Sequence, residues 1–292
     1  MDLGTRSYTY DALGEMTNGS DGKSQSFSGT FDALSRPLTR TEPEGTTTWT
    51  WGNTPANHDI GQLQQVSQSG YAESYAYDSQ GRLSNRQIVS DATYAYDYSY
   101  STTTGLPDTV TYPTSTASYR LKLQYLYQNG ILQKVKDFNA STIFWQANTT
   151  NPSGQVTQET LGNGVVTNKS FDAVTGWVSS IQSGLTTGSA LQNESYLFDL
   201  VGNVTQRQNS NAGLTENFYY DNLYRLDHSI LGATTNLSLS YDAMGNITSR
   251  SDIASGAAWT YDATKKHAVR QAGSASYTYT YDANGNAQTR NG

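Results

Sequence analysis

The sequence predicts an all-β fold, built as a repetitive strip of short antiparallel hairpins that is curved or spiralled. Three observations predict it: a recurring aromatic–Asp unit, strands that alternate aromatic and polar residues, and an unusual composition. Hydrophobic residues make up 35% of the chain, below the roughly 45–50% of an ordinary globular domain. The 22 Tyr residues dominate the aromatics, while charged residues reach only 15%. This combination indicates thin β-structure and not disorder, because disordered chains are poor in aromatic residues.

The repeated unit has the form aromatic–Asp–Ala–x–Gly–Asn–hydrophobic–Thr. Its cleanest copy is Tyr241-Asp242-Ala243-Met244-Gly245-Asn246-Ile247-Thr248. The clear copies keep three residues, and we predict that these form the structural turns: Tyr10, Asp11, Gly14, Tyr77, Asp78, Gly81, Phe198, Asp199, Gly202, Tyr241, Asp242, Gly245, Tyr281, Asp282 and Gly285. Looser copies begin at Phe31, Phe171, Tyr220 and Tyr261, and in the middle we expect Tyr96, Tyr127 and Trp145 to take the aromatic position.

The spacing of the unit matches the length of a hairpin. In the C-terminal third the aromatic recurs at positions 198, 220, 241, 261 and 281. A step of about 20 residues accommodates two short strands and two turns. The repetition therefore predicts one hairpin per unit.

Each residue of the unit has a physical role in a turn. The Asp carboxylate can accept backbone N–H groups of the turn that it starts. The next two residues suit the centre of a type I turn, and Gly suits the following position, where φ is positive. This is a common three-residue hairpin connection. Nine copies of the Asp in one local context favour turn capping over catalysis, because an acid–base pair needs a unique site.

The strands alternate in the way that a sheet with two different faces requires. Tyr277, Tyr279 and Tyr281 share one face, and the intervening threonines share the other. We expect the rings to form ladders between neighbouring hairpins and to keep their hydroxyls in water. Stability is then a property of neighbouring units, since a lone hairpin does not hold.

Charge and composition exclude several classes of function. Eighteen Lys and Arg against 25 Asp and Glu give a net charge of −7, so nucleic acid and anionic membranes are not expected partners. No apolar run reaches the roughly 18 residues of a membrane span. The chain has no Cys, which removes disulfides and thiolate sites. We predict no cofactor and no metal site, because no His pair or acidic loop has a ligand spacing.

The unit Tyr-Asp-x-x-Gly-Asn/Arg-Leu/Ile-Thr resembles the Rhs or YD repeat. This repeat occurs in bacterial polymorphic toxins, in insecticidal toxin-complex B and C subunits and in teneurins. Further phrases resemble the bacterial branch, among them Gly154-Gln155-Val156-Thr157 and Lys265-Lys266-His267-Ala268-Val269. The resemblance covers essentially the whole chain. It implies a β-strip that spirals into a hollow shell, which commonly sequesters a C-terminal toxin or effector.

The resemblance implies a structural role and not an enzymatic one. We expect residues 1–292 to be one continuous YD-repeat strip, and a fragment of a longer chain, because both ends lie inside repeats. The expected function is a wall segment of a secreted or cell-surface bacterial protein that encapsulates or presents a C-terminal toxin. The expected partner is the rest of the parent chain, including its cargo. The self-cleavage site that bacterial members carry is not found here, so no protease activity is carried over.

Two alternatives remain open at this point. The first is an adhesive module that binds glycans or cell-surface proteins through aromatic rings, for which the candidates are Trp49, Trp51, Trp145, Trp177 and Trp259. The second is a polysaccharide-cleaving enzyme, which needs a deep pocket with a His or Tyr base and a cation. His58, His228 and His267 are far apart in sequence, and the densest basic cluster is Lys265, Lys266, His267 and Arg270.

Overall fold

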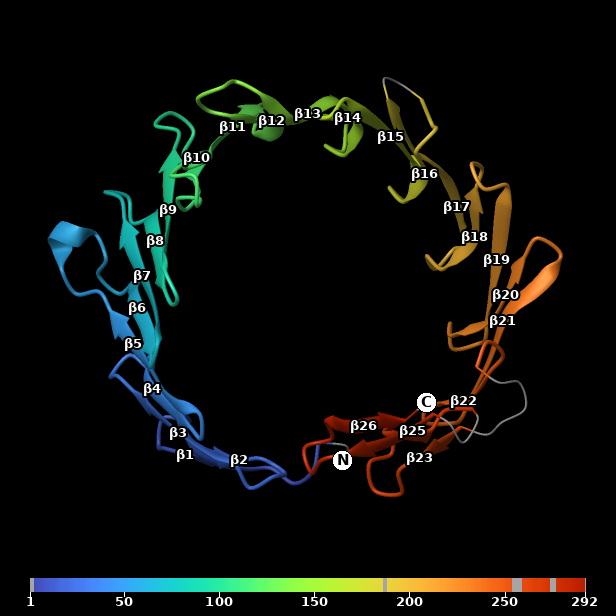
Figure 1. The fold of residues 1–292 in the computed structure, drawn as a ribbon, viewed down its shortest axis with the longest axis horizontal. Coiled ribbons are helices and arrows are strands. Elements are labelled where there is room, and N and C mark those ends of the chain that lie inside the picture. Colours follow the sequence, from blue (N-terminus) through green and yellow to red (C-terminus); the bar gives the residue numbers. More distant parts are fainter. Residues whose placement is uncertain (1–2, 186–187, 254–258, 274–276, 292) are drawn as a thin grey trace. The chain divides into compact units, whose positions relative to one another are not determined.

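A computed structural model of the chain describes residues 3–185, 188–253, 259–273 and 277–291. It is nearly all antiparallel β-sheet, as predicted (Figure 1). The one helical element in the described residues is a single 3₁₀ turn, η1 (Pro55–Asn57). No helix in these residues is long and apolar enough to cross a membrane.

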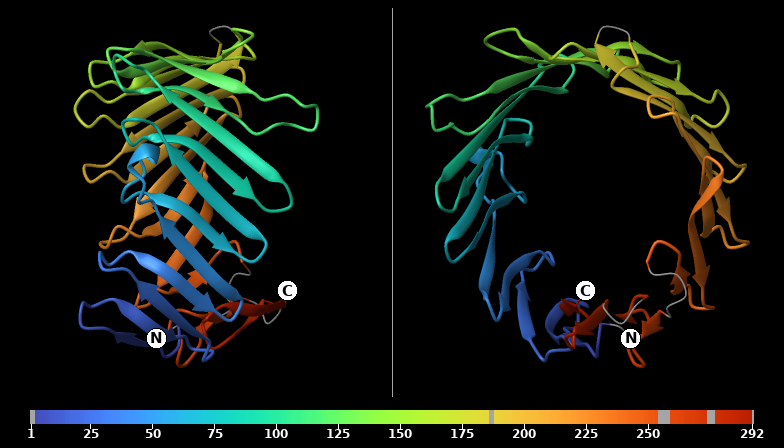
Figure 2. Two further views of the ribbon diagram at one scale, coloured as in Figure 1. Left: turned by 90° about the vertical axis from the view of Figure 1, so that its left-hand side faces the viewer. Right: turned by 45° about the vertical axis from the view of Figure 1, so that its right-hand side comes forward.

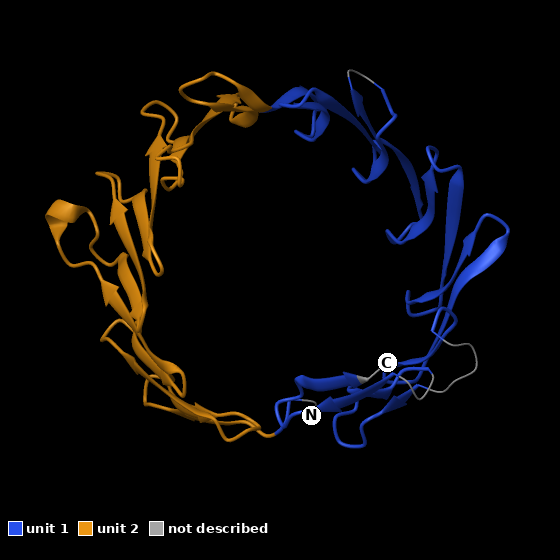
Figure 3. Ribbon diagram, viewed as in Figure 1, with its two compact units in different colours: residues 1–4, 145–292 blue, residues 5–144 orange. Residues whose placement is uncertain are grey.

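The structure divides into two units, one of residues 5–144 and one of residues 1–4 and 145–292 (Figure 3). The strands of the first unit are β1 (Ser7–Tyr10), β2 (Met16–Ser20), β3 (Ser26–Phe31), β4 (Pro37–Glu42), β5 (Gly45–Trp51), β6 (Leu63–Gln68), β7 (Tyr71–Tyr77), β8 (Leu83–Val89), β9 (Thr93–Tyr100), β10 (Pro107–Thr111), β11 (Lys122–Gln128) and β12 (Ile131–Asp137).

The second unit continues the same pattern. Its first strand begins two residues before the boundary. The strands are β13 (Ile143–Thr150), β14 (Val156–Leu161), β15 (Val165–Phe171), β16 (Val178–Leu185), β17 (Gln192–Phe198), β18 (Val204–Asn209), β19 (Leu214–Tyr220), β20 (Leu226–Leu231), β21 (Thr234–Tyr241), β22 (Ile247–Arg250), β23 (Thr260–Tyr261), β24 (Val269–Gln271), β25 (Thr278–Tyr281) and β26 (Ala287–Asn291).

Each strand pairs with at least one strand that is next to it in sequence. Pairing is antiparallel and sequential from β1 to β12, from β13 to β22 and from β23 to β26. Within residues 5–144, successive strands lie side by side and the turns project from both ends of the strands (Figure 2). Strands that follow one another in an antiparallel sheet reverse direction, so every second turn lies at the same edge.

The register shifts at the end of the strand that precedes a YD turn. In β21, Ser240 lies opposite Ser249 but Tyr241 lies opposite Ile247, so Thr248 is an extra residue on its strand. The same shift occurs at Tyr10, Phe31, Tyr77, Phe198, Tyr220 and Tyr281. Such a bulge is expected after a type I turn closed by a residue of positive φ.

The sheet has very little conventional core. Among the described residues, the buried apolar side chains are Ala147, Leu239, Ala268 and Ala272. Most strand residues are instead half-buried, because one sheet layer has nothing stacked on it. Contacts between neighbouring hairpins therefore carry the stability that a core supplies elsewhere.

Candidate functional site: the turn motif and the contacts between hairpins

The aspartate of the repeat closes its own turn, as Asp242 shows. Asp242 N donates to Asn246 O at 2.9 Å, and Gly245 N donates to Asp242 O at 3.1 Å. The Oδ1 atom accepts the N–H groups of Met244 and Asn246 at 2.8 and 2.9 Å, and Oδ2 accepts the Asn246 amide at 2.9 Å. These hydrogen bonds, above all the one from the Asn246 amide, lower the pKa of Asp242.

The same carboxylate contacts recur along the chain. One oxygen accepts the N–H groups two and four residues further on at Asp11, Asp32, Asp78, Asp199, Asp221 and Asp282. Asp172 and Asp262 close a wider turn, with donors two and three residues further on. The geometry thus places all nine repeat aspartates at their own turns.

Two further turns of this form were not found by sequence reasoning. Asp21 and Asn151 accept the same pair of N–H groups, although no aromatic residue precedes either of them. The Asp21 turn joins β2 to β3, at the opposite edge from the YD turns. In both turns an Asp or Asn stands four residues before a Gln, which is the signal that could have identified them.

The position of positive φ is not restricted to glycine. Gly14, Gly81, Gly202, Gly245 and Gly285 have φ between +72° and +98° there. Ser24, Ser35 and Tyr224 take the same position with φ of 62°, 61° and 60°. Glycine adopts this region without the strain that a Cβ introduces.

In six units a tyrosine joins its hairpin to the preceding one. The Tyr241 hydroxyl donates to the Leu226 carbonyl oxygen at 2.9 Å, across a separation of 15 residues. The same contact, at 2.6 to 2.9 Å, runs from Tyr77 to Leu63, Tyr100 to Leu83, Tyr220 to Val204, Tyr261 to Ile247 and Tyr281 to Val269. The expectation that these hydroxyls stay in water is wrong, because each of them donates a hydrogen bond to a backbone carbonyl of the preceding hairpin.

Replacing Tyr241 by Phe is expected to lower the free energy of unfolding by about 1 kcal/mol, because it removes one neutral hydrogen bond and keeps the ring. Urea unfolding followed by circular dichroism measures the change. Tyr219→Phe is the matched control, since Tyr219 is 44% exposed and its hydroxyl bonds to no described residue. A Tyr241→Phe protein as stable as this control would contradict the assigned role of the hydroxyl.

Arginine at the fourth position after Asp makes a second contact between hairpins. Arg82 Nε donates to Asp78 Oδ2 at 2.8 Å, and the guanidinium lies 4.2 Å from the ring centroid of Tyr100 in the next hairpin. The same arrangement joins Asp32, Arg36 and Trp51, and also Asp221, Arg225 and Tyr241. A guanidinium above an aromatic face is attracted by the ring quadrupole, so charge and packing stabilise the same corner.

Two of the three assignments in the middle of the chain are wrong. Tyr96 lies inside β9, in an edge-on contact with Tyr112, and Tyr100 takes the aromatic position instead. Ser101 replaces the aspartate, with its hydroxyl accepting the N–H groups of Thr103 and Thr104. Trp145 lies near the start of β13, whereas the turn of Asn151 follows the end of that strand.

The five tryptophans are all half-buried; Trp49 and Trp51 share β5, and the other three lie in different hairpins. Trp51 Nε1 donates to the Pro37 carbonyl at 2.9 Å, so Trp51 takes the role that tyrosine has in other repeats. Trp145 Nε1 donates to Glu159 at 2.9 Å. Trp177 packs against Phe198 and lies over Gly202, where an added Cβ would be 3.1 Å from the indole. Glycan binding by these rings stays a prediction, and the structure gives three of them a packing role.

Glu73 is the centre of the most closely bonded polar cluster on the strands. It is 9% exposed, and it accepts the hydroxyls of Tyr71 and Tyr75, both at 2.7 Å, as well as Arg86 Nε. The hydrogen bond from Arg86 is the main cause that lowers the pKa of Glu73 to about 2. Burial, followed by the bond to Glu73, raises the pKa of Tyr75 to about 12.

These two pKa shifts predict a loss of stability at both ends of the pH range. Glu73 stabilises the fold above its usual pKa of 4.5, and that contribution is lost as the pH falls toward 2. Tyr75 favours the fold as the neutral phenol, so its contribution is lost as the pH rises from 10 toward 12. Urea midpoints measured against pH, with absorbance of tyrosinate at the basic end, check this. A Glu73→Gln protein should show a weaker acid dependence.

Each of the three histidines takes part in local structure. His58 ends η1 with φ of 55°. His228 stacks on Tyr219 at 4.3 Å between ring centroids, and His267 Nδ1 is 2.6 Å from Asn246 Oδ1. Within the described residues there is no group of three or more His, Asp or Glu that could hold a metal ion.

The basic cluster around His267 belongs to a turn network. The Asn246 amide donates to the Lys266 carbonyl at 3.1 Å, and Arg270 Nε donates to Asp262 Oδ2 at 2.8 Å. These contacts join the YD turn of Asp242 to the next turn along the strip. Arg270 therefore has a structural role at this corner, whereas Lys265 and Lys266 contribute backbone groups to it.

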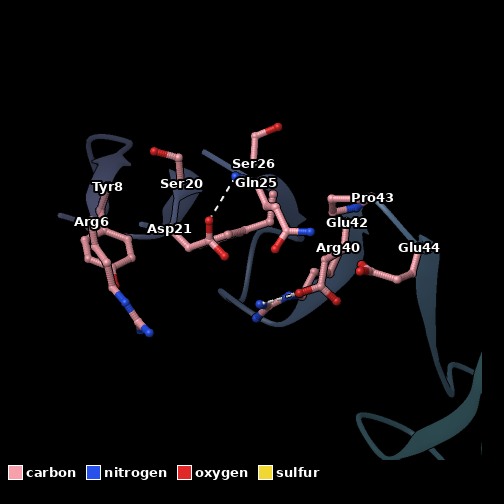
Figure 4. A pocket seen from close by; sticks show the side chains of 11 residues that line it. Arg6, Tyr8, Ser20, Asp21, Gln25, Ser26, Arg40, Glu42, Pro43 and Glu44 are labelled. Carbon is pink, nitrogen blue, oxygen red and sulfur yellow. Dashed lines mark hydrogen bonds and ion pairs between the residues drawn. The ribbon is translucent and has the colours of Figure 1, made fainter. Parts of the chain in front are cut away.

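Three hollows in the surface are open, and the first two of them are mainly polar. The first, of about 300 Å³, lies over β1 to β4 and is shown in Figure 4, where Asp21 accepts the Gln25 N–H and Arg40 pairs with Glu42. The second, of about 380 Å³, is lined by Glu194, Arg207 and Glu216, among others. The third lies between the turns of Asn151 and Asp172. None of these three linings contains a histidine, although the first contains Tyr8 together with Arg6 and Arg40. All three hollows are open, so none of them is the deep pocket that the polysaccharide-cleaving alternative needs.

Comparison with known proteins identifies the fold. No protein-family model and no curated protein sequence matches the chain. Among solved structures, a Tc holotoxin pore of Photorhabdus luminescens matches 99% of this chain at a TM-score of 0.72 and 15% identity. The structure of TcdB2-TccC3 without its hypervariable C-terminal region matches 99% of this chain at a TM-score of 0.75 and 16% identity, and a separate structure, TcdB2-TccC3-Cdc42, matches 99% at 0.73 and 15%.

These matches place the chain in the class of repetitive β-hairpin strips that the Tc toxin structures define. The antiparallel β-hairpin fold that the sequence predicts is thereby confirmed. The chain spans 18% of the length of each of these three solved chains.

Proposed function

We propose that this chain is a wall segment of a YD-repeat shell, in a secreted or cell-surface bacterial protein that encloses or presents a C-terminal toxin or effector. One observation carries the proposal: the recurring aromatic, aspartate and arginine side chains are used to join each hairpin to the next. The chain thus builds a continuous surface in which the motif residues serve as connectors.

The chemistry of the surface supports this role. The turn carboxylates accept hydrogen bonds from the backbone of their own turns, and the tyrosine hydroxyls donate hydrogen bonds to the preceding hairpin. Serine, threonine, asparagine and glutamine pair across strands on the other face, as in the bonds Thr30–Thr39, Thr41–Thr46 and Gln206–Asn217. A wall works by exclusion, and a neutral polar face holds a cargo only weakly because its groups are already bonded to each other.

The matched solved structures support the wall over a free-standing module. One of them is described as a complex lacking a hypervariable C-terminal region, so a variable segment accompanies this fold in that protein. The rest of the parent chain is the partner that we propose here. Catalysis is not part of the proposal.

Protease protection in the complete parent polypeptide tests the proposal. The segment that follows the repeats should be digested slowly in the intact protein and rapidly when it is produced alone. A variant that opens the strip within residues 5–144, such as Gly52→Ala, should lose the protection. Equal digestion of the segment in the intact parent and in isolation would overturn the enclosing wall.

A further inference from the structure

The crowns of four consecutive turns in the unit of residues 145–292 carry exposed apolar side chains. These turns follow β15, β17, β19 and β21, so they lie at the same edge of the strip. The exposed side chains are Val174 (94%), Leu200 (102%), Val201 (59%), Leu223 (70%), Tyr224 (61%) and Met244 (53%). We call this set the crown row.

The turns themselves do not require apolar residues at these positions. Gln80 and Asn284 occupy the position of Leu223 and Met244 in their own turns, and each donates the same backbone N–H to the turn aspartate. Leu223 and Met244 contribute only that N–H to the turn, at 2.8 Å. A contiguous row of exposed apolar side chains without a role in its own fold marks an interaction surface.

We propose that the crown row is a contact edge between strips, and that it docks against the crown row of a second copy of this chain. The turns recur every second strand, so the crowns are about 10 Å apart. Another strip edge has this same period and can meet every crown. An edge that meets its own copy about a twofold axis buries the same side chains on both partners.

The carboxylates of this edge already have partners in their own turns. Those of Asp172, Asp199 and Asp242 accept hydrogen bonds within their turns, and that of Asp221 is paired with Arg225. Six side chains of this size offer roughly 500 Å² of apolar surface. A standard stable interface buries about 800 Å² on each partner, so the expected association is weak and in the micromolar range.

Self-association of the purified chain tests the proposal. Sedimentation of the unmodified chain should show a dimer that forms with rising concentration. The triple variant Leu200→Asn, Leu223→Asn, Met244→Gln should remain a monomer with an unchanged circular dichroism spectrum. The control triple variant, Val89→Thr, Leu126→Asn, Leu197→Asn, removes exposed apolar side chains from strands, and it should still dimerise.

A second measurement locates the contact, since the chain has no natural cysteine. On oxidation, Asn222→Cys at a crown should form about tenfold more covalent dimer than Gln208→Cys on β18, because only the first lies in the contact. A monomeric unmodified chain throughout the micromolar range, or dimerisation that survives the crown variant, would overturn the contact. Neither result changes the protease protection expected in the parent polypeptide. The crown-row proposal and the wall proposal are therefore tested independently.

Discussion

Glu73→Ala is expected to lower the free energy of unfolding of the unit of residues 5–144 by about 2–4 kcal/mol, because it breaks a partly buried ion pair and several hydrogen bonds. The Glu73 side chain is 12% exposed and joins two tyrosine hydroxyls to Arg86. Its removal leaves the Arg86 charge against the ring of Tyr96 without a counter-ion. Urea unfolding followed by circular dichroism measures the loss.

Glu42→Ala is the matched control for this prediction. Glu42 also pairs with an arginine of its own sheet, Arg40, but its side chain is 41% exposed. Such a surface pair contributes about 0–1 kcal/mol, since water screens both charges. Equal stability of the Glu73→Ala and Glu42→Ala proteins would show that the Glu73 cluster does not stabilise the strip.

Gly52→Ala is expected to destabilise the same unit by about 2–3 kcal/mol, because an added methyl group cannot fit without moving backbone. A Cβ at position 52 would overlap the carbonyl oxygen of Asp59. Gly52 N donates to Gln62 O at 2.8 Å, and Gly61 N donates to Gly52 O at 3.0 Å, so these bonds hold the loop closed. The loop between β5 and β6 must open to admit the methyl group, and thermal unfolding reports the change.

Gly70→Ala separates steric overlap from backbone strain. Gly70 has φ of +75°, and a Cβ there meets no other atom within 4 Å. The cost should therefore be only the strain of a left-handed residue, about 1–2 kcal/mol. If Gly52→Ala lowers the free energy of unfolding by no more than Gly70→Ala does, the close approach of Asp59 to Gly52 does not stabilise the loop between β5 and β6.

The turns could be predicted from the sequence because all their atoms are local. The carboxylate of Asp242 and the N–H groups that it accepts lie within five residues. Local side-chain chemistry therefore fixes this corner wherever the unit recurs. The alternation of aromatic and polar residues fixed the two faces of each strand for the same reason.

Where local signals were ambiguous, the prediction failed. Tyr94, Tyr96, Tyr98 and Tyr100 alternate along β9, so the pattern does not show which of them ends the strand. The chain uses Ser101 where other units use Asp, which removed the marker of the turn. The assignment of Tyr96 was wrong for this reason.

The sequence by itself determined the repeat, the hairpin and the carboxylate that closes each turn. Only the tertiary structure decided which groups join one hairpin to the next: the Leu226 carbonyl that receives the Tyr241 hydroxyl, the ring of Tyr100 under Arg82, and the three donors around Glu73. The physical reason is register. These partners are brought together across strands, and the one-residue bulge beside each turn sets which groups face each other.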